Sequence, residues 1–62
     1  MDKPISKRFV VMLVDIYANI GSKVFVKADT CVRGETENIL CVNGAEIDFD
    51  GGYRIEYIEE AH

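Results

Sequence analysis

The last third of the chain carries two turn signals that restrict how its strands can pair. Asn43-Gly44 is the strongest short hairpin signal, because both central residues of a type I′ turn need positive φ. A two-residue loop at this point places Leu40 opposite Ile47 in an antiparallel ladder. The sequence therefore predicts a tight hairpin centred on residues 43–44.

A second turn is predicted at residues 50–52, which read Asp-Gly-Gly. A three-residue loop with Gly52 in the left-handed conformation places Ile47 opposite Ile55. The two registers agree, because both put every large apolar residue of the segment on one face. The residues on that face are Leu40, Val42, Ile47, Phe49, Tyr53, Ile55 and Tyr57.

Residues 7–20 have a pattern that fits either a strand or a helix. Apolar residues occupy both alternating faces, so periodicity alone does not separate a buried strand from a buried helix. Ser6 and Gly21 are suitable helix caps. Five β-branched residues lie between Val10 and Ile20, and such residues lose χ1 freedom in a helix. We therefore expect a strand, with a helix over 7–20 as the alternative.

The remaining segments complete an all-β prediction. Gly21-Ser22 indicates a turn, residues 23–30 alternate as a half-buried strand, and residues 33–38 are polar and typical of a loop. The fold class expected is all-β, a five-stranded antiparallel meander or small barrel. The alternative is α+β, with one N-terminal helix over 7–20 on a four-stranded antiparallel sheet.

The chain length predicts one small domain over residues 1–62, with residues 1–5 and 59–62 frayed. A domain of this size buries only about 60% of the surface of its unfolded chain, so its stability is marginal. Disulfides, a metal or oligomerisation usually compensate. No secretory signal or membrane-spanning run is recognised in the sequence, and we expect a cytoplasmic protein.

The two cysteines are too few for a disulfide scaffold. Cys31 and Cys41 could make one bridge at most, and we expect both to be reduced and partly buried. There is no Cys-x-x-Cys pair, and the single histidine is His62, so no metal site or cofactor is expected. Oligomerisation is the stabilising device that remains.

Catalysis finds little support in the residue types present. His62 lies at a terminus, where it cannot be held within hydrogen-bonding reach of a nucleophile. Ser6 and Ser22, the two serines, lie in turn or capping contexts. No glycine-rich segment precedes a helix as a phosphate-binding loop does. We expect a protein that is not an enzyme.

An acidic face is the first candidate partner site. Residues 1–28 carry five Lys/Arg against two acids (net +3), and residues 29–62 carry two against nine (net −7). The predicted meander places Glu46, Asp48, Arg54 and Glu56 on its second face, with Asp48 opposite Arg54. We interpret the chain as a small regulatory or adaptor module that binds another protein, which is basic.

A second candidate site would bind single-stranded nucleic acid. Lys23, Phe25 and Lys27 share one face of their strand, where an aromatic ring between two cations could stack a base. Lys7 and Arg8 could add phosphate contacts. The sequence pI of about 4.7 counts against this alternative, since nucleic-acid-binding domains are usually basic.

The apolar run near the N-terminus predicts self-association. One face of residues 9–14 can pack on the meander, and the other needs a cover. A second copy of the chain is the simplest cover, and the predicted homo-oligomer interface consists of Val10, Val11, Met12 and Val14.

Overall fold

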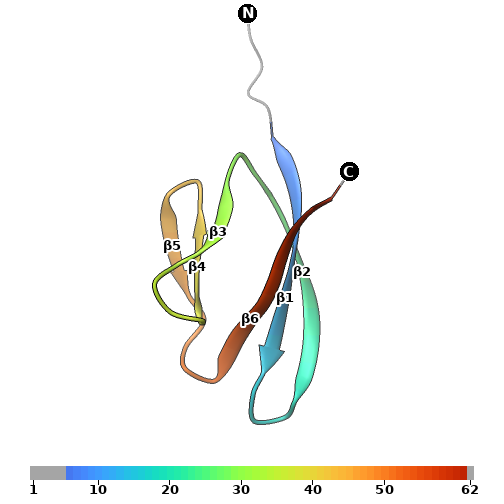
Figure 1. Ribbon diagram of the computed structural model, residues 1–62, viewed down its shortest axis with the longest axis vertical. Helices are drawn as coiled ribbons and strands as arrows, with labels where there is room; N and C mark the ends of the chain where they lie inside the picture. Colours follow the sequence, from blue (N-terminus) through green and yellow to red (C-terminus); the bar gives the residue numbers. More distant parts are fainter. Residues whose placement is uncertain (1–5, 62) are drawn as a thin grey trace, which may run out of the picture.

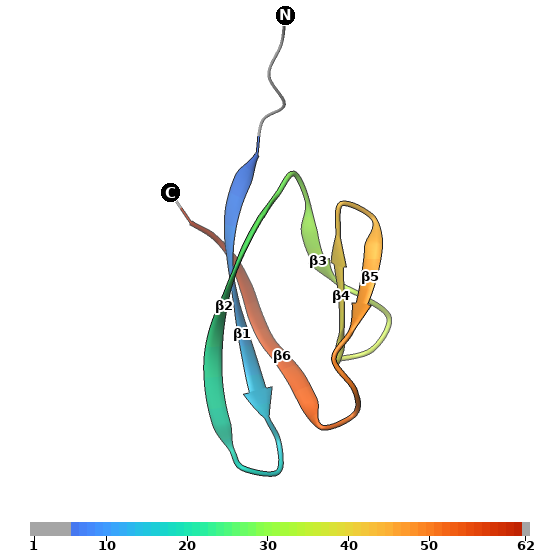
Figure 2. The same ribbon diagram turned by 180° about the vertical axis from the view of Figure 1, so that it is seen from behind.

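The computed structural model describes residues 6–61, which form six strands and no helix (Figure 1). The strands are β1 (Lys7–Asp15), β2 (Ile20–Ala28), β3 (Cys31–Arg33), β4 (Ile39–Val42), β5 (Ala45–Asp48) and β6 (Tyr53–Ala61). They make two three-stranded antiparallel sheets, one in the order β2-β1-β6 and one in the order β3-β4-β5. Figure 2 shows the two sheets from behind, joined by the chain between β2 and β3.

The β1–β2 hairpin turns within residues 16–19. The Asp15 side chain accepts backbone hydrogen bonds from Tyr17 (3.0 Å) and Ala18 (3.1 Å), and Asn19 takes a left-handed φ of 60°. Asp and Asn suit this role because their short polar side chains bond nearby backbone and tolerate positive φ. Nine-residue strands therefore leave the turn on both sides, from Asp15 opposite Ile20 to the open end of the hairpin.

The predicted turn at residues 21–22 is wrong, because both residues lie inside β2. The predicted strand over 7–20 is correct only as far as Asp15, and the helix alternative is absent from the described residues. Gly21 allows the Met12 side chain to pack closely against the backbone of β2, because a Cβ at position 21 would lie 3.0 Å from the Met12 Sδ atom. A glycine inside a strand can mark such a close approach as well as a turn.

The β4–β5 hairpin confirms the first turn prediction. Asn43 and Gly44 have φ values of 51° and 84°, and Leu40 pairs with Ile47 as expected. The Asn43 side chain also accepts hydrogen bonds from the backbone N–H groups of Asp29 (2.9 Å) and of the residue that follows it (3.1 Å). One residue thus shapes the hairpin and ties it to the chain that leaves β2.

The second turn forms at residues 51–52, but the predicted hairpin is wrong, because β5 does not pair with β6. The left-handed residue is Asp50, with a φ of 76°, rather than Gly52. Gly52 instead accepts a hydrogen bond from Ile16 at 3.0 Å, which starts β6 alongside β1. β5 has four residues, too few to satisfy the backbone of a nine-residue β6, which pairs instead with the nine-residue β1.

The core lies between the two sheets. Its fully buried members are Val11, Cys31, Leu40 and Ile55, and the half-buried residues packed on them are Phe9, Leu13, Val24, Val26, Val42, Phe49 and Ile58. Both sheets contribute to this cluster, so neither has a core of its own. Ile47, which the predicted meander would bury, is 42% exposed because β5 is an edge strand.

The all-β prediction is therefore confirmed, while the single five-stranded meander is replaced by six strands in two sheets. The expected frayed tail at 59–62 continues β6 as far as Ala61, and residue 62 lies outside the described range. The expected frayed lead-in at 1–5 lies outside that range as well.

Candidate binding surfaces

One face of the β2-β1-β6 sheet packs on the core, and the other is open to solvent. Alternation along β1 sends Val11 into the core, where it is 0% exposed, while Val10, Met12 and Val14 lie on the opposite face. These three side chains are only half-buried, and no strand of the second sheet covers them. We call this side the open face. Val11 therefore does not belong with the other predicted interface residues.

The β2 side of the open face is basic and aromatic. Phe25 lies beside Val10 in the ladder and is 76% exposed, and Lys23 and Lys27 flank it on the same side of β2. Lys27 is paired with Arg8 of β1, so two cations lie directly opposite each other. Such a like-charge pair lowers the stability of the sheet. A hollow of about 350 Å³ lies at this end, lined by Arg8, Phe9, Phe25, Val26, Lys27 and Ala61.

The β6 side of the open face has a different character. Arg54 lies beside Val14, Tyr57 beside Met12, and Glu59 beside Val10. The face therefore runs from lysines on β2, over apolar residues on β1, to a row on β6 that ends in a cation at one end and a carboxylate at the other, with an aromatic ring between them. This order of charges gives the face a direction that a partner could match.

The structure divides the predicted acidic partner site between two sheets. Glu46 and Asp48 lie on β5, whereas Arg54 and Glu56 lie on β6. The expected pair of Asp48 with Arg54 is absent, because the strands that carry them do not pair. Asp48 accepts instead from the Asn38 amide at 2.9 Å, and Arg54 bonds Glu56 at 2.8 Å. Both ion-pair partners are about half exposed, so the pair adds little stability.

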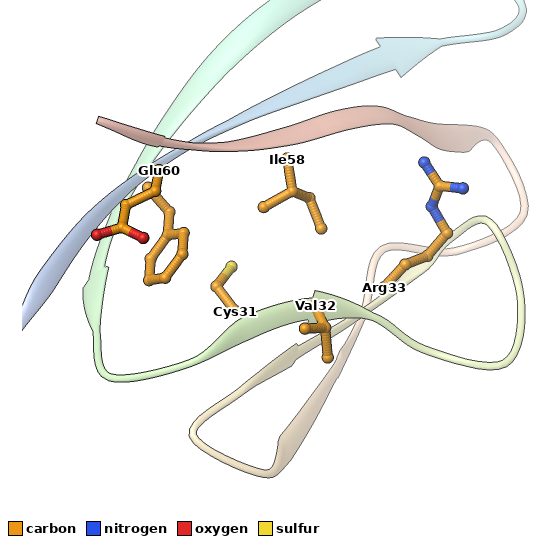
Figure 3. Close-up of a pocket in the computed structure, with 6 residues that line it drawn as sticks. Cys31, Val32, Arg33, Ile58 and Glu60 are labelled. Atoms are coloured by element: carbon orange, nitrogen blue, oxygen red, sulfur yellow. The ribbon is translucent and has the colours of Figure 1, made fainter. Parts of the chain in front are cut away.

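The second hollow lies in the seam where β3 faces β6, and we call it the seam hollow. Its volume is about 340 Å³, and its lining residues are Phe9, Cys31, Val32, Arg33, Ile58 and Glu60. Figure 3 shows Cys31 and Ile58 pointing toward each other across the seam, with Glu60 at one end and Arg33 at the other. The Arg33 guanidinium donates to the backbone carbonyls of Ile55 (3.0 Å) and Glu56 (3.3 Å), which ties β3 to β6 at that end.

Cys31 is a buried thiol in the wall of this hollow. Both cysteines are free, and burial raises the pKa of the Cys31 thiol above its ordinary value of 9.0. A raised pKa keeps the sulfur protonated at neutral pH, which suits packing better than nucleophilic chemistry. Cys41 lies on the neighbouring strand and is half-buried.

Within residues 6–61, no three side chains of the His, Cys, Asp and Glu types are grouped to hold a metal ion. That part also contains no helix that is long and apolar enough to cross a membrane.

Comparisons with protein-family models, with curated proteins and with solved structures gave no match to this chain. The surfaces of the molecule therefore carry the functional argument.

Sequence reasoning found Lys23, Phe25 and Lys27 as neighbours and named Arg8 as a further phosphate contact, but it missed the seam hollow. Alternation of residue types along single strands was the signal for these residues. The seam hollow had no such signal, because its lining residues come from three strands that are distant along the chain.

Proposed function

We propose that this chain is a non-enzymatic protein-binding module that pairs with a second copy of itself through the open face. The supporting observation is the row of Val10, Met12 and Val14 on the central strand, whose side chains are half-buried and lie on the face opposite the core. Apolar side chains gathered on an exposed sheet face are typical of an interaction surface. The adjacent Phe25 and Tyr57 enlarge the apolar area on either side of this row.

Charge supports a second copy as the occupant. A two-fold axis along β1 would bring the β2 side of one copy over the β6 side of the other. Lys23 and Tyr57 lie level with Met12, so the ammonium group of one copy would meet the ring of the other as a cation–π contact. Glu59, one level away, would meet the lysine-flanked side of β2.

The area of the open face sets the expected affinity of the dimer. Strands of nine residues are about 30 Å long, and three strands are about 14 Å wide, which gives roughly 400 Å² per copy. An interface of this size is at the small, weak end of specific protein contacts. We therefore expect reversible dimers with a Kd in the micromolar range or above, rather than an obligate assembly.

Sedimentation equilibrium of the reduced protein across this concentration range tests the proposal. Met12→Lys should shift the equilibrium to monomer, because a buried, unpaired ammonium group is costly at the centre of an interface. Ile20→Lys is the matched control, since this exposed residue of β2 lies off the open face and its variant should dimerise normally. A wild-type chain that stays monomeric at the highest concentrations, or equal effects of the two variants, would refute the proposal.

A second candidate function uses the same face. The exposed Phe25 ring, its flanking lysines and the opposed cation pair at Arg8 would suit a single-stranded nucleic acid, by stacking and phosphate contact. A labelled oligothymidylate would then bind with steep salt dependence, and Phe25→Ala would abolish binding. Arg8→Ala would weaken it, whereas Lys7→Ala, its neighbour on the other side of the strand, would not. Salt-independent or absent binding would exclude this candidate.

An acidic edge remains available for a basic protein. Glu46 and Asp48 are both exposed on β5, although the other two residues of the predicted site lie on β6. The double variant Glu46→Gln and Asp48→Asn would reveal such docking as lost binding to a basic probe such as polylysine.

A further inference from the structure

β2 is an edge strand, and its outer side pairs with no strand of residues 6–61. In the sheet order β2-β1-β6 it has β1 on one side only, and Figure 1 shows it along the outer margin of that sheet. All nine of its residues are in register with β1 without a bulge. Bulges, prolines and short length are common ways in which proteins protect an edge strand from further pairing. β2 has none of the three, so its outer backbone groups form a regular row.

The odd-numbered residues of β2 direct their backbone groups to this free edge. The N–H of Ile16 donates to the carbonyl before β6 at 3.0 Å, so even-numbered residues of β1 bond toward β6 and odd-numbered ones toward β2. The register pairs the odd-numbered residues of β1 with the even-numbered residues of β2. The residues left with outward-pointing N–H and C=O groups are therefore Gly21, Lys23, Phe25 and Lys27.

The same residues carry their side chains on the open face. Lys23 and Lys27 flank Phe25 there, and all three are exposed. The side chains of Val24 and Val26, which alternate with them, turn toward the core and are half-buried. A strand added at this edge in antiparallel register places one residue directly beside each of Lys23, Phe25 and Lys27. The free edge thus offers backbone hydrogen bonds and, at three alternate positions, side chains that select the added strand.

Charge determines which strand fits the free edge. The one ion pair formed within residues 6–61 lies on β6, so Lys23 and Lys27 have no carboxylate partner in that range. Lys27 also lies opposite Arg8, and a carboxylate on the outer side of Lys27 would offset the repulsion between these two cations. Two copies of β2 paired edge to edge about Phe25 would instead set Lys23 against Lys27. The lysines therefore oppose pairing of β2 with itself and favour an acidic strand.

We propose that the free edge of β2 binds an extended acidic segment of a partner protein, which pairs with it as a fourth strand of the sheet. The segment has acidic residues beside Lys23 and Lys27 and an aromatic residue beside Phe25, so its pattern is acid-x-aromatic-x-acid. Its intervening residues lie beside Val24 and Val26 and are β-branched. The segment adds at the side of the sheet and not over the open face, so this proposal does not depend on the dimer.

The probe is a blocked pentapeptide, glutamate-valine-tyrosine-valine-glutamate. Its sequence reads the same in both directions, so it presents its acids and its ring correctly to an antiparallel or a parallel neighbour. Amide hydrogen exchange followed by NMR on the intact chain measures the result. In the free chain, the amides of Lys23, Phe25 and Lys27 should exchange fast, and those of Val24 and Val26 slowly. Saturating peptide should slow exchange of the first three by about tenfold or more, so that the alternation along β2 disappears.

Two methylated peptides separate strand addition from contacts made by side chains alone. One is N-methylated at the tyrosine, and the other is N-methylated at both valines. In an antiparallel ladder the tyrosine N–H bonds to β2 and the valine N–H groups point away, and in a parallel ladder these roles are reversed. One of the two methylated peptides should therefore lose binding, while the other keeps it.

Charge is tested on both the peptide and the protein. A peptide with lysine in place of both glutamates should not bind. Lys27→Met should weaken binding of the acidic peptide about three- to fivefold, the range of an exposed ion pair, whereas Lys7→Met on β1 should not. Unchanged exchange at the outward-pointing amides of β2, equal binding of the two methylated peptides, or equal binding of the acidic and lysine peptides would overturn the proposal.

Discussion

The pair formed by Leu40 and Ile47 allows burial to be tested at constant backbone pairing. The two residues lie opposite each other in the β4–β5 ladder and have the same number of carbon atoms. Leu40 is 1% exposed in the core, whereas Ile47 is 42% exposed at the sheet edge. Replacing each with alanine therefore removes three carbons from the same ladder in two different environments.

The expected costs follow from that difference. Burial contributes about 0.8 kcal/mol per CH₂, and a substitution at a buried site also loses the contacts around the new cavity. Leu40→Ala should therefore lower the free energy of unfolding by about 3 kcal/mol. Ile47→Ala leaves no closed cavity and should cost about 1 kcal/mol. A chain of 62 residues has a total stability of about 3–9 kcal/mol, so Leu40→Ala should leave it close to unfolding.

Urea unfolding followed by circular dichroism measures both costs at one protein concentration, which is held fixed because self-association changes apparent stability. With a slope of about 1 kcal/mol per molar urea, the midpoints should fall by about 3 M and about 1 M. Equal losses for the two variants would refute the reasoning, because they would mean that β5 is covered as deeply as β4.

Four further outcomes are expected. Asn43→Ala should lower the free energy of unfolding by about 1–3 kcal/mol. Asn43→Gly should recover the share of this loss that comes from positive φ, but not the share that comes from the side-chain hydrogen bonds, and thermal unfolding of both variants would show the difference. Cys31 should react with iodoacetamide at least tenfold more slowly than Cys41 in the folded protein and equally fast in urea. Burial raises the pKa of the Cys31 thiol in the folded state, so the stabilising effect of this thiol is full at neutral pH and is lost as the pH rises past 9.0. Wild type should therefore lose more stability than Cys31→Ala in alkaline titrations. Arg33→Met should speed hydrogen exchange in the first half of β6, because it leaves two backbone carbonyls without their donor. Unchanged exchange there would mean that the Arg33 hydrogen bonds do not tie β3 to β6.

The candidate sites were predictable to the extent that they lie on single strands. Alternation alone placed Lys23, Phe25 and Lys27 on one side of β2, and the register with β1 sets Arg8 directly opposite Lys27. The predicted acidic residues do not share one face, because that prediction depended on a pairing of β5 with β6 that the molecule does not make. The seam hollow was out of reach, since it exists only where two sheets meet.

The local features of this protein can be read in its sequence. The Asn43-Gly44 turn, the register of Leu40 with Ile47 and the strand character of residues 7–15 all follow from short-range conformational preferences. Positive φ at a two-residue turn allows few residue types, and β-branched side chains favour an extended backbone whatever surrounds them.

Which strands become neighbours is a property of the tertiary structure. β6 pairs with β1, far earlier in the chain, rather than with β5, which is too short to satisfy its backbone. That choice splits the chain into two sheets, buries Val11 and leaves Met12 on the open face. Strand alternation can be read in a sequence, but which face is covered depends on the packing of segments that are far apart in it.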